Sequence, residues 1–323
     1  MQNERKIFIL TEKLDTHADA VIGELNRRGK PFFRLNTNDF HTEYEVALRS
    51  DDGAIRFDDL WGRSIVFPDQ VHASWYRKPK DTNNPPGVSE RGVAETIQNE
   101  TLEMLNYLSA MRDRPWYNHP ESNRVAQRKF PQIRLARELG LRVPRTLITN
   151  DPGEARRFAA EAPGDLLCKA MKEAGYSLEH ESYFIFSRRV TKPELLANAD
   201  LIKLCPTLIQ EYVDKAYELR VTIMGDAVFA CRLDSQTEEA ARTDWRRVSP
   251  DRIAHRMVTL DERVEAALKQ MLRRLELRFG AFDLIVTPQN EVVFLELNPN
   301  GQWYWIELIT GAPMVSAMAD LLS

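Results

Sequence analysis

The segment from residue 280 to residue 307 constrains the fold and the chemistry of this chain more than any other. It reads GAFDLIVTPQNEVVFLELNPNGQWYWIE, with two apolar runs on either side of the turn sequence PQN at residues 288–290. Such runs around a short turn predict an antiparallel hairpin. Three side chains with hard oxygen atoms interrupt it: Asp283 in the first strand, and Glu296 and Asn298 at the end of the second.

Asp283, Glu296 and Asn298 are expected to share one face of this hairpin. Residues two apart on a strand point the same way, and the hairpin can bring Asp283 across from the neighbouring strand. Two carboxylates and an amide oxygen suit Mg²⁺ that keeps water ligands and binds substrate phosphates. The alternative is an acidic strand end at the surface, which is a common feature. Because an unpaired carboxylate in an apolar strand is costly, we favour the ion site.

Composition and charge limit the partners and the compartment. The chain has 323 residues, enough for two or three domains, and 44 basic against 48 acidic residues give a net charge of −4. This balance does not favour nucleic acid or an anionic membrane as a partner. The N-terminal apolar run, residues 7–10, is too short for a signal peptide or a membrane span. Three separated cysteines without a C-x-x-C pair argue against disulfides and structural zinc, so we expect a cytoplasmic protein.

The first third of the chain predicts a small β-α-β domain. Residues 6–11 and 31–35 read as strands, and residues 16–28 between them read as an amphipathic helix. The chain has no G-x-G-x-x-G, and a near match to a phosphate loop in this helix has the wrong spacing. After a later strand, Arg77 and Lys78 could hold an acidic ligand or a peptide. A strand whose last residues extend into water is an equally good interpretation.

Charged residues also interrupt apolar strands in the middle of the chain. Lys169 lies in a short strand predicted over residues 166–170, where a lysine usually has an anionic partner nearby. The polar loop after it carries Gly175 and Ser177. It could fold over phosphates with its backbone N–H groups, although most such loops only connect strands. Upstream, a helix is predicted over residues 121–139. Pro131 within it favours a first half that is a separate turn or short helix.

Three ionisable residues lie on strands of the C-terminal third. The two-residue turn Gly225-Asp226 predicts a hairpin whose first strand carries Glu218 and Arg220 and whose second carries Arg232. They indicate either a polar site over one face of the sheet or a cross-strand ladder of ion pairs. The six histidines are scattered without the spacing of metal ligands, so the sequence assigns them no chemistry.

The order of these features resembles the ATP-grasp superfamily over residues 115–315. The ending FLELNPNGQWYWIE, together with SQTEEAARTDWRR, RVPRTLIT and WYRKP upstream, is similar to the graspetide, or microviridin-type, ATP-grasp macrocyclases, which mature ribosomally made peptides. This resemblance implies an α/β (α+β) fold of three parts. They would be an N-terminal pre-ATP-grasp β-α-β domain over residues 1–115, a central lid subdomain over residues 116–205, and a C-terminal antiparallel-sheet catalytic subdomain over residues 206–323.

The resemblance also implies roles for the polar residues. Lys129 and Lys169 would hold the α- and β-phosphates of ATP as point charges. Asp283, Glu296 and Asn298 would ligate one or two Mg²⁺ ions. The residues implied in catalysis are Lys169, Arg220 and Arg232, of which the two arginines would neutralise the γ-phosphate and an acyl phosphate. The other implied nucleotide contacts are Glu173, Gly175, Tyr176, Ser177, Gln210, Glu211, Tyr212, Val213 and Glu218. The implied peptide contacts are Arg77, Lys78, Asp244, Arg246 and Asn300.

The implied reaction activates an Asp or Glu side chain of a precursor peptide as an acyl phosphate, with release of ADP. A Thr or Ser hydroxyl, or a Lys amine, of the same peptide would then displace phosphate and close a ring through an ω-ester or an ω-amide. The implied partners are the leader-bearing precursor peptide and a second copy of the chain in a homodimer. No residue stands out as the base that deprotonates the hydroxyl.

Two other functions remain open at this stage. One is an ATP-grasp ligase that acts on free amino acids or on a protein C-terminus, with the same nucleotide site. The other is a non-catalytic nucleotide- or peptide-binding protein. A non-catalytic relative would be expected to lose part of the set Lys169, Asp283, Glu296 and Asn298, and all four are present.

Overall fold

A parallel sheet forms the base of the N-terminal part, as the alternation of strand and helix predicts. The computed structural model describes residues 5–110, 112, 114–172, 175–178 and 181–323, without the side chains of 175–178 and 181–184. The sheet has the order β2-β1-β6-β7, and a second, antiparallel sheet has the order β3-β4-β5. The elements are β1 (Lys6–Thr11), α1 (Thr16–Arg27), β2 (Phe32–Asn36), α2 (Phe40–Glu43), β3 (Tyr44–Leu48), β4 (Ile55–Asp59), β5 (Ser64–Phe67), β6 (Val71–Tyr76), α3 (Arg91–Ala110) and β7 (Trp116–Tyr117).

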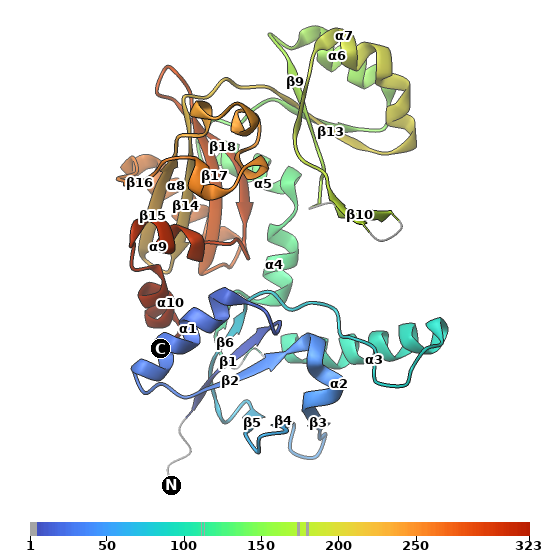
Figure 1. The fold of residues 1–323 in the computed structure, drawn as a ribbon, viewed down its shortest axis with the longest axis vertical. Helices are drawn as coiled ribbons and strands as arrows, with labels where there is room; N and C mark the ends of the chain where they lie inside the picture. The colour runs from blue at the N-terminus through green and yellow to red at the C-terminus, as the bar shows by residue number, and fades with distance from the viewer. Residues whose placement is uncertain (1–4, 111, 113, 173–174, 179–180) are drawn as a thin grey trace.

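Two short helices connect this part to the rest of the molecule (Figure 1). They are α4 (Pro120–Ala126) and α5 (Lys129–Glu138), so the separate first half that Pro131 favoured is confirmed. The break lies before the proline, which occupies the first turn of α5. A proline is tolerated there because the first backbone N–H groups of a helix have no partner within it. The division leaves Lys129 as the first residue of α5.

The middle of the chain forms a separate lobe above the connecting helices (Figure 1). Its four-stranded sheet has the order β12-β9-β13-β8, and β10 pairs with β11 in a hairpin that extends away from it. Two helices pack on one face of the sheet through Leu166, Ile209 and their neighbours. The elements are β8 (Thr146–Thr149), α6 (Pro152–Glu161), β9 (Leu166–Lys169), β10 (Gly175–Leu178), β11 (Glu181–Phe184), β12 (Arg188–Val190), α7 (Lys192–Asn198) and β13 (Thr207–Glu211).

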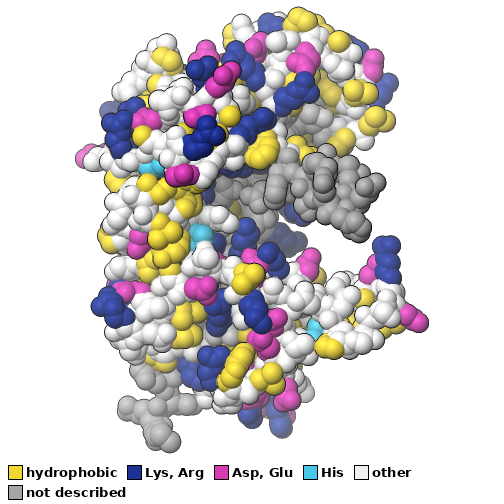
Figure 2. Space-filling model, in the orientation of Figure 1, with side chains coloured by type: hydrophobic (Ala, Val, Ile, Leu, Met, Phe, Trp, Pro, Cys, Tyr) yellow, Lys and Arg dark blue, Asp and Glu magenta, His cyan; other side chains and the backbone are white. Residues whose placement is uncertain are grey.

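The C-terminal part is a five-stranded antiparallel sheet in the order β16-β15-β14-β17-β18. The hairpin predicted around residues 288–290 is confirmed as β17 and β18. In Figure 2, Lys and Arg side chains gather in the recess between the N-terminal part and the C-terminal and middle parts above it. The elements are β14 (Tyr217–Met224), β15 (Ala227–Leu233), β16 (His255–Val258), α8 (Glu262–Arg274), β17 (Phe279–Val286), β18 (Val292–Asn298), α9 (Tyr304–Thr310) and α10 (Met314–Leu322).

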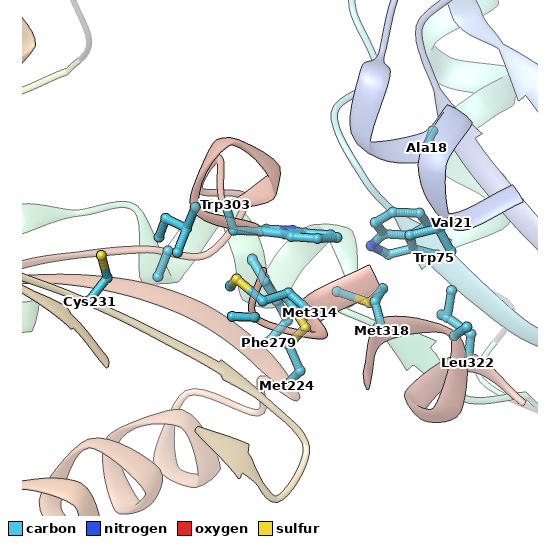
Figure 3. Packing of buried hydrophobic residues seen from close by; sticks show 14 of the residues in the cluster. Ala18, Val21, Trp75, Met224, Cys231, Phe279, Trp303, Met314, Met318 and Leu322 are labelled. Carbon is cyan, nitrogen blue, oxygen red and sulfur yellow. The ribbon is translucent and has the colours of Figure 1, made fainter. Parts of the chain in front are cut away.

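One hydrophobic core joins the two ends of the chain. Trp303, which is fully buried, packs in a cluster that also contains Trp75 from β6, Val21 from α1 and Met318 from α10 (Figure 3). A second core, on the other face of the C-terminal sheet, lies against α5 and α8. The C-terminal sheet is therefore fixed against the N-terminal part at the end where the hairpin finishes. Within the described residues, no helix is long and apolar enough to span a membrane.

Candidate active site

Three neighbouring strands bring the predicted ion ligands together. Arg220 on β14 is paired in register with Asp283 on β17, which is paired with Glu296 on β18. Because paired residues in antiparallel strands point to the same face, these side chains form a row across the sheet. The side-chain amide of Asn298 completes the group, since its Nδ2 donates to Asp283 Oδ2 at 3.1 Å and to Glu296 Oε1 at 3.3 Å. The predicted clustering of the three ligands is thus present.

A β-bulge in the second strand sets this alignment. Leu284 pairs with Phe294, whereas Asp283 pairs with Glu296, so Leu295 is an extra residue in β18. Bulges locally re-aim side chains and are common beside active sites. Without the extra residue, Asp283 would face position 295 and the two carboxylates would be out of register. The sequence pattern gave no sign of this bulge.

Two lysines from distant segments surround Glu296. The ammonium group of Lys129, at the start of α5, forms an ion pair with its carboxylate. Burial alone would raise the pKa of Glu296, but the charges of Lys129 and Lys169 outweigh it and lower that pKa. Lys169, at the end of β9, has its pKa lowered to about 8, chiefly by desolvation, while the charge of Glu296 opposes the shift. Glu296 is therefore ionised at neutral pH, and its charge favours the protonated form of Lys169.

Arg220 and Asp283 form the second charged pair of the site. Arg220 Nη1 donates to Asp283 Oδ1 at 2.7 Å, and Nη2 donates to the backbone oxygen of Gln302 at 2.9 Å. Burial raises the pKa of Asp283 against the opposing effect of Arg220, and the nearby charge of Glu296 raises it further. A Cβ atom on Gly301 would lie 2.8 Å from Arg220 Nη2, which explains why the loop after β18 has a glycine there.

Arg246 reaches this site from a loop that the sequence assigned to peptide contact. Its Nε and Nη2 donate to Asp244 at 2.8 and 2.7 Å, and this hydrogen-bonded pair raises the pKa of Arg246. Arg246 is also close enough for its charge to lower the pKa values of both Asp283 and Glu296. Asp244, which is buried, thus holds a fourth cation at the carboxylates. The peptide contact of Asp244 and Arg246 stays a prediction, while the charge of Arg246 lies beside the carboxylates of Asp283 and Glu296.

The position predicted for Arg232 is wrong. Arg232 pairs in register with Leu219, one residue away from Arg220, so its side chain lies on the opposite face of the sheet. There its guanidinium lies 3.9 Å from the ring centre of Tyr217, and Nε donates to Asp234 at 2.6 Å. This face belongs to the core beneath α8, where the side chain lines a cavity of about 470 Å³. Arg232 cannot reach phosphates bound at Glu296.

The residues predicted to bind the nucleotide base lie on or beside strand β13. Gln210 is buried, shares the face of Lys169, and donates to Thr146 Oγ1 at 2.9 Å. Glu211 accepts from the backbone N–H of Arg145 at 3.4 Å. The guanidinium of Arg189 lies over the ring of Tyr212. Val213 follows the strand.

Glu218 lies on β14 on the same face as Arg220, in the position expected of a hydroxyl-binding carboxylate. It accepts from Lys215 Nζ at 2.8 Å, and burial raises its pKa while Lys215 opposes the shift. The sequence patterns did not identify Lys215. In the predicted lid loop, Glu173 lies outside the described residues. The backbone of Gly175, Tyr176 and Ser177 belongs to β10.

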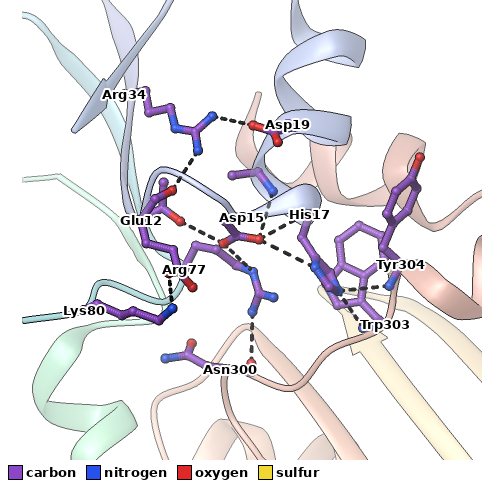
Figure 4. A network of polar contacts seen from close by, with 12 residues as sticks. Glu12, Asp15, His17, Asp19, Arg34, Arg77, Lys80, Asn300, Trp303 and Tyr304 are labelled. Carbon is purple, nitrogen blue, oxygen red and sulfur yellow. Dashed lines mark hydrogen bonds and ion pairs between the residues drawn. The ribbon is translucent and has the colours of Figure 1, made fainter. Parts of the chain in front are cut away.

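Two predicted peptide contacts are instead part of the junction between the N-terminal part and the C-terminal sheet (Figure 4). Arg77 is only 2% exposed, pairs with Asp15 at 3.2 Å, and donates to the backbone oxygen of Asn300 at 2.9 Å. The prediction of direct peptide contact is therefore wrong for Arg77. Asn300 and Lys78 are both partly exposed. Asn300 takes part in the junction through its backbone oxygen, and the peptide contact of both residues stays a prediction.

The donor set fits Mg²⁺. Two carboxylates and one amide converge. In the described ranges, no group of three or more His, Cys, Asp or Glu side chains is arranged to hold a metal ion. An octahedral ion at this site would take its remaining ligands from water and phosphates, which is usual for Mg²⁺. The ammonium of Lys129 now occupies one side of Glu296, as a cation would.

The sequence and the fold match known proteins. The family model of the MvdD pre-ATP-grasp domain matches residues 6–124. Over 98% of this chain and 99% of the other, the structure resembles the macrocyclase MdnC from Microcystis aeruginosa MRC, bound with precursor peptide MdnA, at 28% identity and a TM-score of 0.86. The chain therefore resembles the graspetide-type ATP-grasp macrocyclases in sequence and in fold.

Two further solved structures agree with this family. The macrocyclase MdnB of the same organism shares 28% identity at a TM-score of 0.80, over 98% of this chain and 99% of MdnB. A RiPP-associated ATP-grasp ligase of Chryseobacterium gregarium, in complex with ADP and leader and core peptides, shares 25% identity at a TM-score of 0.89, over 98% and 96% of the two chains. The predicted ATP-grasp fold is thus confirmed. A search of curated proteins finds no match.

Proposed function

We propose that this ATP-grasp protein is an ADP-forming ligase that closes rings in a ribosomally made precursor peptide. The observation that carries the proposal is the pair Asp283–Glu296, held with Asn298 on one sheet face and surrounded by Lys129, Lys169 and two arginines. An ion-binding centre with several cations suits a triphosphate. The similarity to macrocyclases solved with precursor or core peptides supports a peptide as the acceptor.

The proposed roles follow from the contacts. Asp283, Glu296 and Asn298 would hold Mg²⁺, with the amide of Asn298 turned so that its oxygen faces the ion. Bound Mg²⁺ would neutralise phosphate oxygens. Lys129, displaced from Glu296 by the ion, would be free to bind a phosphate beside Lys169. The base would lie against β13, near Gln210, and Glu218 would accept from the ribose hydroxyls.

The reaction needs positioning and charge neutralisation more than covalent help from the protein. An Asp or Glu carboxylate of the peptide attacks the γ-phosphorus of ATP, the bond to the β-phosphate oxygen breaks, and ADP leaves. A hydroxyl or amine of the same peptide then attacks the acyl carbon and releases phosphate, so each ring costs the peptide one water. The negative charge that develops in both steps would be balanced by Arg220, Arg246 and the two lysines.

Arg246 and Arg232 give opposite expectations. Replacing Arg246 with leucine removes a charge beside the carboxylates, and we expect kcat to fall by roughly 10²- to 10³-fold, as when one preorganised donor is lost. Replacing Arg232 with leucine changes the far face of the sheet and leaves kcat close to wild type. Steady-state ADP release by both variants is the measurement. A larger loss for Arg232→Leu would contradict this assignment of the two arginines.

The acceptor distinguishes the proposal from its rival, a ligase for free amino acids. With Mg-ATP, release of ADP should require the precursor peptide and should not respond to mixtures of free amino acids. ADP released only with amino acids would favour the rival, and AMP as the product would exclude an acyl phosphate. The homodimer implied by the resemblance and the cytoplasmic location expected from the cysteines remain predictions. Light scattering tests the first of them.

A further inference from the structure

The loop after β18 is held by side chains from several other segments. It follows Asn298, a proposed ion ligand, and runs through residues 299–303 to the start of α9 at Tyr304. Its backbone oxygens accept from Asn118 at 3.0 Å, from Arg77 at 2.9 Å and from Arg220 at 2.9 Å. The loop thus depends on the N-terminal part for its shape, because Arg77 and Asn118 follow strands of that sheet.

His17 makes the contact at the end of this loop. Its Nε2 accepts from the backbone N–H of Trp303 at 2.9 Å and from that of Tyr304 at 3.1 Å (Figure 4). A nitrogen that accepts two N–H groups carries no proton, so the ring is neutral and its proton is on Nδ1. Nδ1 lies 3.6 Å from Asp15 Oδ1, and the ring is packed edge-on against Trp303, 5.1 Å between centres.

Asp15 fixes His17 in this orientation. Its carboxylate accepts from the backbone N–H of His17 at 3.0 Å and from Thr11 Oγ1 at 2.8 Å, and it pairs with Arg77. The same carboxylate therefore supports two side chains that hold the loop. The junction is buried: His17 is 6% exposed and Asp15 is 5% exposed. A buried and fully oriented imidazole is suited to hold a backbone position.

We propose that His17 is a positioning residue for the ion site. As a neutral acceptor for Trp303 and Tyr304, it fixes the loop so that Asn298 faces the carboxylates and the Gln302 oxygen holds Arg220 against Asp283. The proposal rests on the proposed function, because it assumes that Asn298, Asp283 and Glu296 bind a metal. Supports of this kind behind metal ligands typically contribute 10- to 100-fold to metal affinity.

Acid should weaken this support. Protonation would place an N–H at Nε2 against two N–H donors. Burial lowers the pKa of His17, Asp15 opposes the shift, and the charges of Arg77 and Lys78 add to it. Because the folded protein then binds fewer protons than the unfolded chain, the contribution of His17 is complete above the ordinary histidine value of 6.5 and is lost as the pH falls below it.

Two substitutions separate the acceptor from the rest of the side chain. In His17→Gln, the amide oxygen can stand near the position of Nε2 and accept the same bonds without titrating. In His17→Asn, the shorter amide falls at the position of Nδ1 and leaves Trp303 and Tyr304 without an acceptor. His41→Gln is the matched control, since His41 lies on α2 of the same part and contacts Thr101 instead of the loop.

The experiment measures the binding of Mn²⁺ in the presence of ADP. Binding is monitored by electron paramagnetic resonance at a pH above the ordinary histidine pKa of 6.5. We expect His17→Asn to bind Mn²⁺ about tenfold more weakly than wild type, and His17→Gln and His41→Gln to bind as wild type. Equal Mn²⁺ affinity for all variants would overturn the proposal. Equal losses of affinity in His17→Asn and His17→Gln would also overturn it, because packing alone would then explain the effect. If wild type binds no Mn²⁺, the ion site itself has failed.

The pH dependence supplies a second readout that needs no Asn variant. Between about pH 8 and about pH 5.5, wild type should lose Mn²⁺ affinity more steeply than His17→Gln, because only wild type has a titrating acceptor in the loop. The carboxylates titrate equally in both proteins, so the difference isolates His17. Identical pH profiles would contradict the proposed role.

Discussion

Glu296→Gln should abolish ADP release and leave the fold in place. The substitution keeps the size of the side chain but removes the charge that pairs with Lys129 and stabilises the ammonium of Lys169. It also removes the central carboxylate of the proposed ion site. Loss of a residue behind a metal ligand already costs up to 100-fold, so we expect the loss of this ligand to lower the rate by more than about 100-fold. The measurement is ADP release with saturating Mg-ATP and peptide, beside a thermal melt.

Glu291→Gln is the matched control for this prediction. Glu291 lies at the turn of the same hairpin, and its exposed carboxylate pairs with Arg142 at the surface. Exposed ion pairs contribute little to stability, and this one is not part of the charged row. Its rate should therefore equal that of wild type. An active Glu296→Gln protein would disprove the metal assignment.

Arg220→Leu should have the largest effect on stability. Both partners are largely buried, and the change leaves the carboxylate of Asp283 without its cation and Gln302 without its donor. Breaking a buried pair from one side costs about 3–5 kcal/mol. We therefore expect the free energy of unfolding, measured in urea, to fall by about that amount. ADP release should be lost as well, because we propose that Arg220 also balances charge at the site.

The double variant Arg220→Leu/Asp283→Leu tests the reason for that loss. With both charges removed, no buried charge remains unpaired, and apolar replacements of such pairs are often close to neutral. Most of the lost stability should return, whereas activity should not. If the double variant is as unstable as the sum of the single ones, the pair is not coupled and the account of Arg220 is wrong.

Local patterns in the sequence were sufficient for the strands, the hairpin of β17 and β18, and the clustering of its ligands. Periodicity of two and a short turn fix which residues of a hairpin share a face. The same rule could have corrected Arg232. The two-residue turn Gly225-Asp226 pairs residue 224 with 227, and counting back pairs Arg220 with Cys231, which leaves Arg232 on the other face.

Contacts between distant segments could not be predicted in this way. The pair of Lys129 and Glu296 joins residues 167 apart, and His17 meets Trp303 across 286 residues. Nothing in the local pattern around His17 distinguishes it from the other histidines. Likewise, Arg77 reads as a free cation at a strand end, and only the packing of the C-terminal sheet on the N-terminal part explains its burial. The tertiary fold decides such roles, since burial and partners are set by it.

The mass of the precursor peptide after reaction is the most direct test of the whole account. The wild-type protein is incubated with Mg-ATP and a leader-bearing precursor peptide, and the peptide mass and the amounts of ADP and AMP are measured together. We expect the peptide to lose whole molecules of water, one for each ADP formed, and Glu296→Gln to leave its mass unchanged. An unchanged peptide mass with the wild-type protein, while ADP forms from free amino acids, would contradict the account.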